Sequence, residues 1–175
     1  VYVSSNSEAL FNNSYNSRQS VLASKNTRGT IYSSDGDILA QTVKDEDGKE
    51  VRNYPYDNMF AHIVGYSTKG KTGLESLANY YLINTSATVA QQAENSAAGR
   101  KNPGNNLYTT LDMNLQQTAY NAMGIYKGAI VVMEVDTGKI LAMVSKPDFN
   151  PNEIADIWDS VTSDKENSSL LNRAS

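Results

Sequence analysis

Residues 128–145 read Gly-Ala-Ile-Val-Val-Met-Glu-Val-Asp-Thr-Gly-Lys-Ile-Leu-Ala-Met-Val-Ser, and this stretch decides the fold class. Two apolar runs, 129–133 and 140–144, flank the polar sequence 136–139. A short polar turn that contains Gly138 predicts a β-hairpin, because glycine readily adopts the left-handed conformation such a turn requires. Neither run alternates apolar with polar residues, which is typical of strands in a sheet covered on both faces.

The segment before this hairpin predicts a strand and a helix. Residues 107–111 are β-like, Asp112 is placed as the N-cap of a helix, and Gly124 is placed to end it. The expected inward face of that helix carries Leu115, Ala119, Ala122 and Met123.

One helix and one hairpin cannot cover both faces of the hairpin or satisfy its outer edges. No further strand is predicted after Ser145. We therefore expect the chain to begin a second domain and to stop before completing it. We also expect the hairpin 129–144 to pair with a second copy of the chain or with other segments of it.

The N-terminal half predicts a mixture of short strands and helices. Residues 28–56 indicate antiparallel strands, with a turn at 34–36 and a hairpin closed through Asp47 and Gly48. Residues 57–100 are mostly helical in pattern, and one amphipathic face has the spacing i, i+3, i+4, i+7 and i+8. That face consists of Leu74, Leu77, Ala78, Tyr81 and Leu82.

The predicted fold class is therefore α+β, a small body of short antiparallel strands and helices followed by an incomplete strand–helix–hairpin unit. Residues 1–27 are polar and predict a loosely held N-terminal arm, with weak helical spacing at Ala9, Leu10 and Tyr15. The polar stretch that ends near Pro103 is the candidate boundary between the two larger units. The expected divisions are 1–27, 28–102 and 103–175.

Composition narrows the class of function. The chain has 175 residues, a formal net charge of −4 and no cysteine. An acidic chain lacks the basic footprint of a nucleic-acid-binding protein, so no nucleic-acid partner is expected. The absence of cysteine removes disulfides and thiol catalysis. No window is apolar enough to span a bilayer, and the sequence begins with Val1 and no signal peptide, so we expect an excised piece of a longer chain.

Few residues could carry chemistry. His62 is the only histidine and is expected to be structural, and no histidine-based metal site is expected from one residue. The sequence 45–48 resembles the opening of a calcium loop but lacks the rest of that pattern. Lys71-Thr72-Gly73 matches one motif of the serine penicillin-recognising enzymes, yet no serine has a lysine three residues later. No catalytic, cofactor-binding or metal-ligating residue is predicted.

Five segments, in chain order, nevertheless resemble motifs of the class B penicillin-binding proteins. The fourth is the hairpin region, and the fifth resembles the stretch that precedes the catalytic serine of that family. Residues 60–66 are most similar to the penicillin-binding protein A branch. The five segments are Arg28–Ala40, 70–75 (Gly-Lys-Thr-Gly-Leu-Glu), 104–116, 128–152 and 171–174 (Leu-Asn-Arg-Ala).

The resemblance implies a non-catalytic pedestal, residues 28–102, followed by the start of a transpeptidase domain. The intact parent would be a membrane-anchored serine D,D-transpeptidase that cross-links peptidoglycan on the extracytoplasmic face of the bacterial membrane. Its anchoring helix would lie outside this sequence, and no cofactor is implied. Implied partners are the catalytic domain of the same parent, a polytopic glycosyltransferase and other wall-synthesis proteins.

The motif residues are expected to join the pedestal to the catalytic domain. We predict ion pairs among four of them, namely Arg28, Glu75, Asp112 and Arg173. The full set of expected interdomain residues is Arg28, Gly29, Gly73, Leu74, Glu75, Thr110, Asp112, Gln116 and Arg173.

Two alternatives remain open. The first is a stand-alone extracytoplasmic module that binds glycans or proteins through its many Tyr and Asn side chains. The second is an independent hydrolase, for which the sequence offers no nucleophile–base pair. Glycan binding without a parent catalytic domain would favour the first, and measurable turnover the second.

Overall fold

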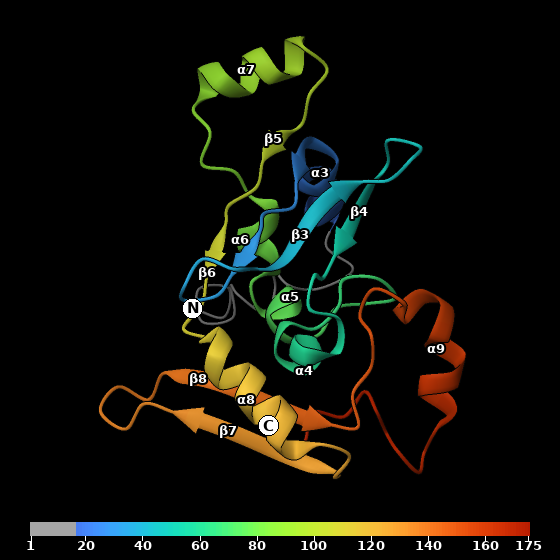
Figure 1. Ribbon diagram of the computed structural model, residues 1–175. Helices are drawn as coiled ribbons and strands as arrows, with labels where there is room; N and C mark the ends of the chain where they lie inside the picture. The colour runs from blue at the N-terminus through green and yellow to red at the C-terminus, as the bar shows by residue number, and fades with distance from the viewer. Residues whose placement is uncertain (1–16) are drawn as a thin grey trace, which may run out of the picture.

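Short helices and strands build the structure, a computed structural model that describes residues 17–175 (Figure 1). The helices are α3 (Ser17–Lys25), η1 (Asp57–Phe60), α4 (Ala61–Val64), α5 (Gly73–Leu77), α6 (Asn79–Ile83), α7 (Val89–Ala97), α8 (Met113–Met123) and α9 (Ile154–Ser163). The strands are β1 (Asn26–Thr27), β2 (Ile31–Tyr32), β3 (Ile38–Lys44), β4 (Glu50–Asn53), β5 (Asn102–Pro103), β6 (Leu107–Tyr108), β7 (Gly128–Met133) and β8 (Ile140–Lys146). The predicted α+β class is confirmed.

A four-stranded sheet organises the N-terminal half, in the order β4-β3-β2-β6. The pairs β4–β3 and β3–β2 are antiparallel, as predicted, and Thr42 lies opposite Arg52. The pair β2–β6 is parallel and places Leu107 opposite Ile31. This last pair crosses the predicted boundary between 102 and 103, so the two units share one sheet.

The main hydrophobic core lies against this sheet. Leu39 and Ala40 from β3 and Ile31 from β2 are buried with residues of η1, α4 and α6. The buried members are Ile31, Leu39, Ala40, Tyr54, Met59, Phe60, Val64, Leu82 and Leu111. A second cluster joins Tyr66 and Ala61 to Phe149 and Ile154, and it packs α9 beside the region of α4.

The predicted single helix face over 74–82 is wrong. Two helices, α5 and α6, meet at Ala78, whose dihedral angles of φ −95° and ψ 13° break the helical path. The bend separates the predicted face into two directions. Leu82 is fully buried, whereas Leu77 is 80% exposed and Tyr81 is 50% exposed.

Helix α8 begins and ends as predicted but presents a different face. The Asp112 carboxylate accepts a hydrogen bond from the Leu115 amide at 2.8 Å, and Gly124 closes the helix. Ala119 and Met123 are buried as predicted, whereas Leu115 and Ala122 are exposed. A polar residue, Gln116, takes the fully buried position. The helix crosses one face of the hairpin (Figure 1).

The predicted hairpin is confirmed, with β7 and β8 antiparallel and Gly138 at a φ of 73°. Its two faces differ. Ile130 and Val144 are paired and pack against α8. On the other face, Val131 is 44% exposed and Met133 is 55% exposed, so residues 17–175 do not cover both faces of β7. Pairing of this hairpin with a second copy stays a prediction.

The described part of the predicted N-terminal arm is packed, which corrects the expectation of a loose segment. Helix α3 contacts α6, and the buried Asn26 donates from its Nδ2 to the carbonyl of Ile83 at 2.9 Å. β1 pairs in parallel with β5. The helical spacing at Ala9, Leu10 and Tyr15 lies outside the described residues.

Helix α7 contrasts with the rest because it stands away from the body at the end of two limbs of chain (Figure 1). None of its residues is buried. A capping box between Thr88 and Gln91 supports its first turn. Within residues 17–175, no helix has the length and apolarity that a membrane crossing needs.

Candidate functional site

A buried carboxylate holds two arginines in the N-terminal half. Glu75, in α5, is fully buried. Its Oε2 receives the Arg28 Nε at 2.6 Å, and its Oε1 receives the Arg52 Nε at 2.7 Å. The two arginine side chains are only 12% and 6% exposed. This Glu75 cluster, defined as Arg28, Arg52 and Glu75, joins the segment before β2, the strand β4 and the helix α5.

Further hydrogen bonds fix both guanidinium groups. Arg28 donates to the Asn79 side chain and to the backbone carbonyl of Glu75, each at 2.7 Å. Arg52 donates from Nη1 to the carbonyl of Gly29 at 2.7 Å. Such bonds are needed here because a buried ion pair stabilises a fold only when its remaining polar atoms are satisfied.

Burial shifts the acid–base properties around the cluster. Removal from water lowers the pKa of Arg28, and the positive charge of Arg52 lowers it further, against the opposing pull of Glu75. Burial, together with the negative charge of Glu75, raises the pKa of the Tyr54 phenol. Tyr54 is therefore neutral at physiological pH, and its hydroxyl donates to Glu75 Oε1 at 3.4 Å.

Two predicted glycines lie where the backbone leaves no room. A Cβ on Gly29 would stand 1.9 Å from the carbonyl oxygen of Asn105. Gly73 has a φ of +53°, and a Cβ there would lie 2.5 Å from the carbonyl oxygen of Ile63. A side chain at position 29 would push the segment of Arg28 away from Asn105, and one at position 73 would push α5, which carries Glu75, away from the backbone of residues 63–65. Leu74, the neighbouring predicted residue, packs against the main core.

A buried amide joins the two halves of the chain. The Gln116 side chain donates from Nε2 to the carbonyls of Met59, at 2.7 Å, and Met143, at 2.9 Å. Its Oε1 accepts the Met143 amide at 2.8 Å. This Gln116 clamp, defined as Gln116 with the Met59 and Met143 backbone, pairs both backbone groups of Met143 in β8 and ties that strand to η1.

The residues just before Gln116 also bond to β8. Thr110 donates from Oγ1 to the carbonyl of Ile140 at 2.5 Å. The Asp112 amide donates to the carbonyl of Leu141 at 2.8 Å, while its carboxylate caps α8. Three of the predicted residues therefore attach one stretch of chain to a single strand of the hairpin.

Arg173 has a different role from the one predicted. Its guanidinium donates to the carbonyls of Asn167, Ser168 and Leu171, and its amide donates to the Ser145 hydroxyl at 2.9 Å. Among residues 17–175, neither Arg173 nor Asp112 has an ion-pair partner. Of the four predicted charges, only Arg28 and Glu75 pair. Arg52, which pairs with the same carboxylate, was not predicted because it lies in no recognisable motif.

The other residues considered for chemistry, His62 and residues 71–73, make contacts that support the fold. His62 is 8% exposed, contacts the carbonyl of Pro147 through Nε2 at 3.1 Å and packs edge-on against Phe149. Burial lowers the pKa of its imidazole. Thr72 is extended and Gly73 begins α5, so the sequence 71–73 runs into a helix. No group of side chains suited to a metal ion occurs in the part of the chain that the structure describes.

Comparisons with known proteins identify two family models along the chain. The model "Penicillin binding protein A dimerisation domain" matches residues 28–107, and the model "Penicillin binding protein transpeptidase domain" matches residues 128–175. The Glu75 cluster lies in the first match and β7 and β8 in the second. The stretch with Thr110, Asp112 and Gln116 lies between them.

Curated relatives and solved structures agree with these models. The peptidoglycan D,D-transpeptidase PbpA of Mycolicibacterium smegmatis is 34% identical over 165 residues, covering 84% of this chain and 33% of the relative. The crystal structure of PBPA from Mycobacterium tuberculosis superimposes with a TM-score of 0.74 at 32% identity, covering 86% of this chain and 38% of that one.

A D,D-transpeptidase domain from Eggerthella lenta gives a TM-score of 0.70 at 37% identity, covering 86% of this chain and 32% of that one. The chain thus spans about a third of the length of the relatives it matches.

Proposed function

This chain belongs to the class B penicillin-binding proteins, in the penicillin-binding protein A branch, and from that premise we propose that it is their non-catalytic pedestal joined to the opening part of a transpeptidase domain. The proposed division is a pedestal over residues 28–102 and a transpeptidase part over 103–175. The whole protein would be a serine D,D-transpeptidase that cross-links peptidoglycan.

One observation carries this proposal: the Gln116 clamp. The side chain is fully buried and bonds at once to Met59 in the proposed pedestal and to Met143 in the proposed transpeptidase sheet. A buried amide with all its partners satisfied fixes the relative position of the elements that supply them. A pedestal needs this property, because its task is to hold a catalytic domain in place.

Catalysis is assigned to other parts of the whole protein. Acyl-enzyme chemistry needs a serine with an activating lysine one helical turn later, and the sequence contains no such pair. We therefore assign this chain no catalytic residue. The nine motif residues, from Arg28 to Arg173, are proposed to position the two units relative to each other.

Location and partners follow as parts of the same proposal. The whole protein would act at the extracytoplasmic face of the bacterial membrane and be anchored there. The pedestal would contact a polytopic glycosyltransferase and other wall-synthesis proteins. Self-association through the hairpin 129–144 is also proposed, since Val131 and Met133 present apolar surface on one face.

Fluorescent penicillin tests the proposal directly. We would label this chain beside the intact protein from its source. Labelling of the intact protein alone is the expected result. Covalent labelling of this chain would overturn the assignment of a non-catalytic role, because it would reveal a nucleophile among these residues.

A second candidate function rests on a stacked aromatic pair with one exposed ring. The rings of Tyr32 and Tyr108 stack with centroids 5.0 Å apart, and Tyr108 is 70% exposed. Exposed aromatic rings can pack against the apolar faces of sugars, so this pair favours a glycan-binding module. Retention on peptidoglycan strands that is lost in Tyr108→Ala would support it, and equal retention of both proteins would exclude it.

A further inference from the structure

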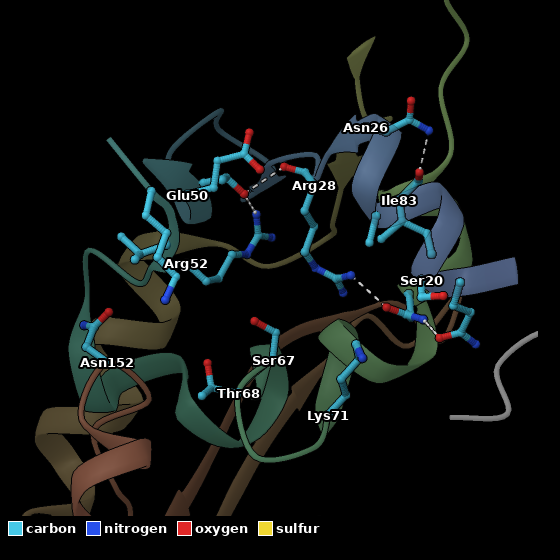
Figure 2. Close-up of a pocket in the computed structure, with 16 residues that line it drawn as sticks. Ser20, Asn26, Arg28, Glu50, Arg52, Ser67, Thr68, Lys71, Ile83 and Asn152 are labelled. Carbon is cyan, nitrogen blue, oxygen red and sulfur yellow. Dashed lines mark hydrogen bonds between the residues drawn. The ribbon is translucent and has the colours of Figure 1, made fainter. Parts of the chain in front are cut away.

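A cavity of about 760 Å³ opens beside the Glu75 cluster. Its walls come from α3, β3, β4, α6 and the segment 67–71. In Figure 2 the side chains of Arg28, Arg52, Ser67 and Lys71 are directed toward the same central space. The mechanism proposed above makes no use of this cavity.

The charge of the cavity wall is opposite in sign to the net charge of the chain. Four basic side chains and one acidic side chain line it, whereas the chain carries a net charge of −4. The acidic one, Glu50, is already engaged: its carboxylate accepts from the Thr27 hydroxyl at 2.5 Å and from the Lys101 ammonium at 2.7 Å. The basic residues are Arg28, Lys49, Arg52 and Lys71.

Glu75 does not neutralise the two arginines beneath the cavity. One carboxylate faces two guanidinium groups, so this buried group keeps an excess positive charge. Tyr54 adds no negative charge, because burial and Glu75 raise the pKa of its phenol. Excess charge withdrawn from water is unfavourable unless a counter-charge lies near it.

Arg52 also has an unused donor. The Arg52 side chain is only 6% exposed, and its Nη2 is buried. Within residues 17–175, this Nη2 has no hydrogen-bond partner. A buried donor without an acceptor is unfavourable, and such donors are rare in native structures. Arg52 itself lines the cavity, so an acceptor that entered beside its guanidinium group would give this donor a partner, and a negatively charged acceptor would also offset the excess charge.

Lys71 faces the same space. The pKa of its ammonium is lowered, mainly because it is partly withdrawn from water and also because of the positive charge of Arg28. An anion between these cations would reverse that repulsion. Two hydroxyl groups on the same wall, those of Ser67 and Thr68, offer uncharged donors.

From these contacts we infer that the cavity beside Arg52 and Lys71 is a binding site for a small anion with a carboxylate or phosphate group. Both groups carry the negative charge and the several acceptor oxygens that these donors match. The volume of about 760 Å³ exceeds what the anionic group alone fills, so the ligand can carry a substituent.

Arginine side-chain NMR tests this inference on the whole chain. The sequence contains five arginines, so the Nε–Hε resonances of Arg28 and Arg52 can be assigned individually. Inorganic phosphate and succinate are added separately at constant ionic strength and pH. The expected result is a saturable shift of both resonances with at least one anion, and the anion that binds distinguishes phosphate from carboxylate chemistry.

Lys71→Met removes one cation of the site and keeps its stem length. Its affinity for the bound anion should fall by about fivefold or more, the effect of losing one ionic contact. Lys165→Met makes the same charge change at an exposed position far along the chain and should bind normally. Absence of saturation with both anions, or equal affinity in wild type and Lys71→Met, would overturn the site.

Discussion

The Glu75 cluster and the Gln116 clamp solve the same problem with different chemistry. Each centres on one fully buried polar side chain that joins segments far apart in the sequence. The first uses three charges and keeps an excess of positive charge. The second is neutral and has every donor and acceptor matched. We therefore expect the clamp to tolerate change better than the cluster, because an unbalanced buried charge is costlier than an unpaired amide.

The largest effect should come from Glu75→Gln, which keeps the shape and removes the charge. Both Arg28 and Arg52 then lose their carboxylate partner while buried. We expect a destabilisation of about 3–5 kcal/mol, the range for breaking one side of a buried ion pair. Urea unfolding followed by circular dichroism measures it.

Glu94→Gln provides the matched control, because Glu94 pairs with Arg100 at 3.6 Å on the surface and both side chains are more than half exposed. Its effect should be about 0–1 kcal/mol. Equal effects of the two substitutions would show that Glu75 is not the electrostatic centre of the pedestal.

Next in size is Gln116→Ala, which breaks the clamp. The Met143 amide and two backbone carbonyls lose their partner, for a destabilisation of roughly 2–3 kcal/mol. Hydrogen exchange at the Met143 amide should accelerate together with its neighbours in β8. Gln117→Ala is the control, since that exposed side chain bonds only to Asn121 on the surface. Unchanged exchange at Met143 in Gln116→Ala would contradict the clamp.

A smaller effect is expected for Asp112→Ala, which removes the N-cap of α8. The substitution should cost about 1 kcal/mol, whereas Asp112→Asn keeps an acceptor oxygen and should cost less. Thermal unfolding of both variants measures the difference. If the two variants unfold alike, the charge of Asp112 matters and the cap bond does not.

The smallest effect concerns pH and His62. Burial lowers the pKa of this imidazole in the folded state, so the unfolded chain binds the proton more readily. The stabilising contribution of the neutral form is complete above about pH 6.5 and declines as the pH falls below that value. His62→Gln should flatten this part of the stability curve. The test is clean because the sequence contains one histidine, and an unchanged slope would refute the assignment.

Local signals predicted much of this fold. Turn residues near Gly48 and Gly138 and the cap at Asp112 act within a few positions, so the sequence reveals them directly. The bend at Ala78 could not be predicted, because it depends on how α5 and α6 pack. For the same reason the packing of α3 against α6 was missed.

The candidate site shows the same limit. Resemblance pointed to Arg28, Glu75 and Gln116, yet their partners come from tertiary structure. Arg52 bonds to Glu75, which lies 23 positions later in the sequence, and no sequence motif indicates this contact. A helical pattern places apolar residues inward, so it could not show that the Gln116 amide is buried against the edge of β8.

The shared strand β6 has a mechanical consequence. From Leu107 to Gln116 the chain is fastened at short intervals, first to β2 and then to β8, η1 and β8 again. Such a segment behaves as a rigid connection and not as a hinge, because a rotation of one half against the other would break several hydrogen bonds at the same time. Force applied at the proposed pedestal would pass to the hairpin with little lost to bending, and α7, which has no buried residue, is left as the compliant part.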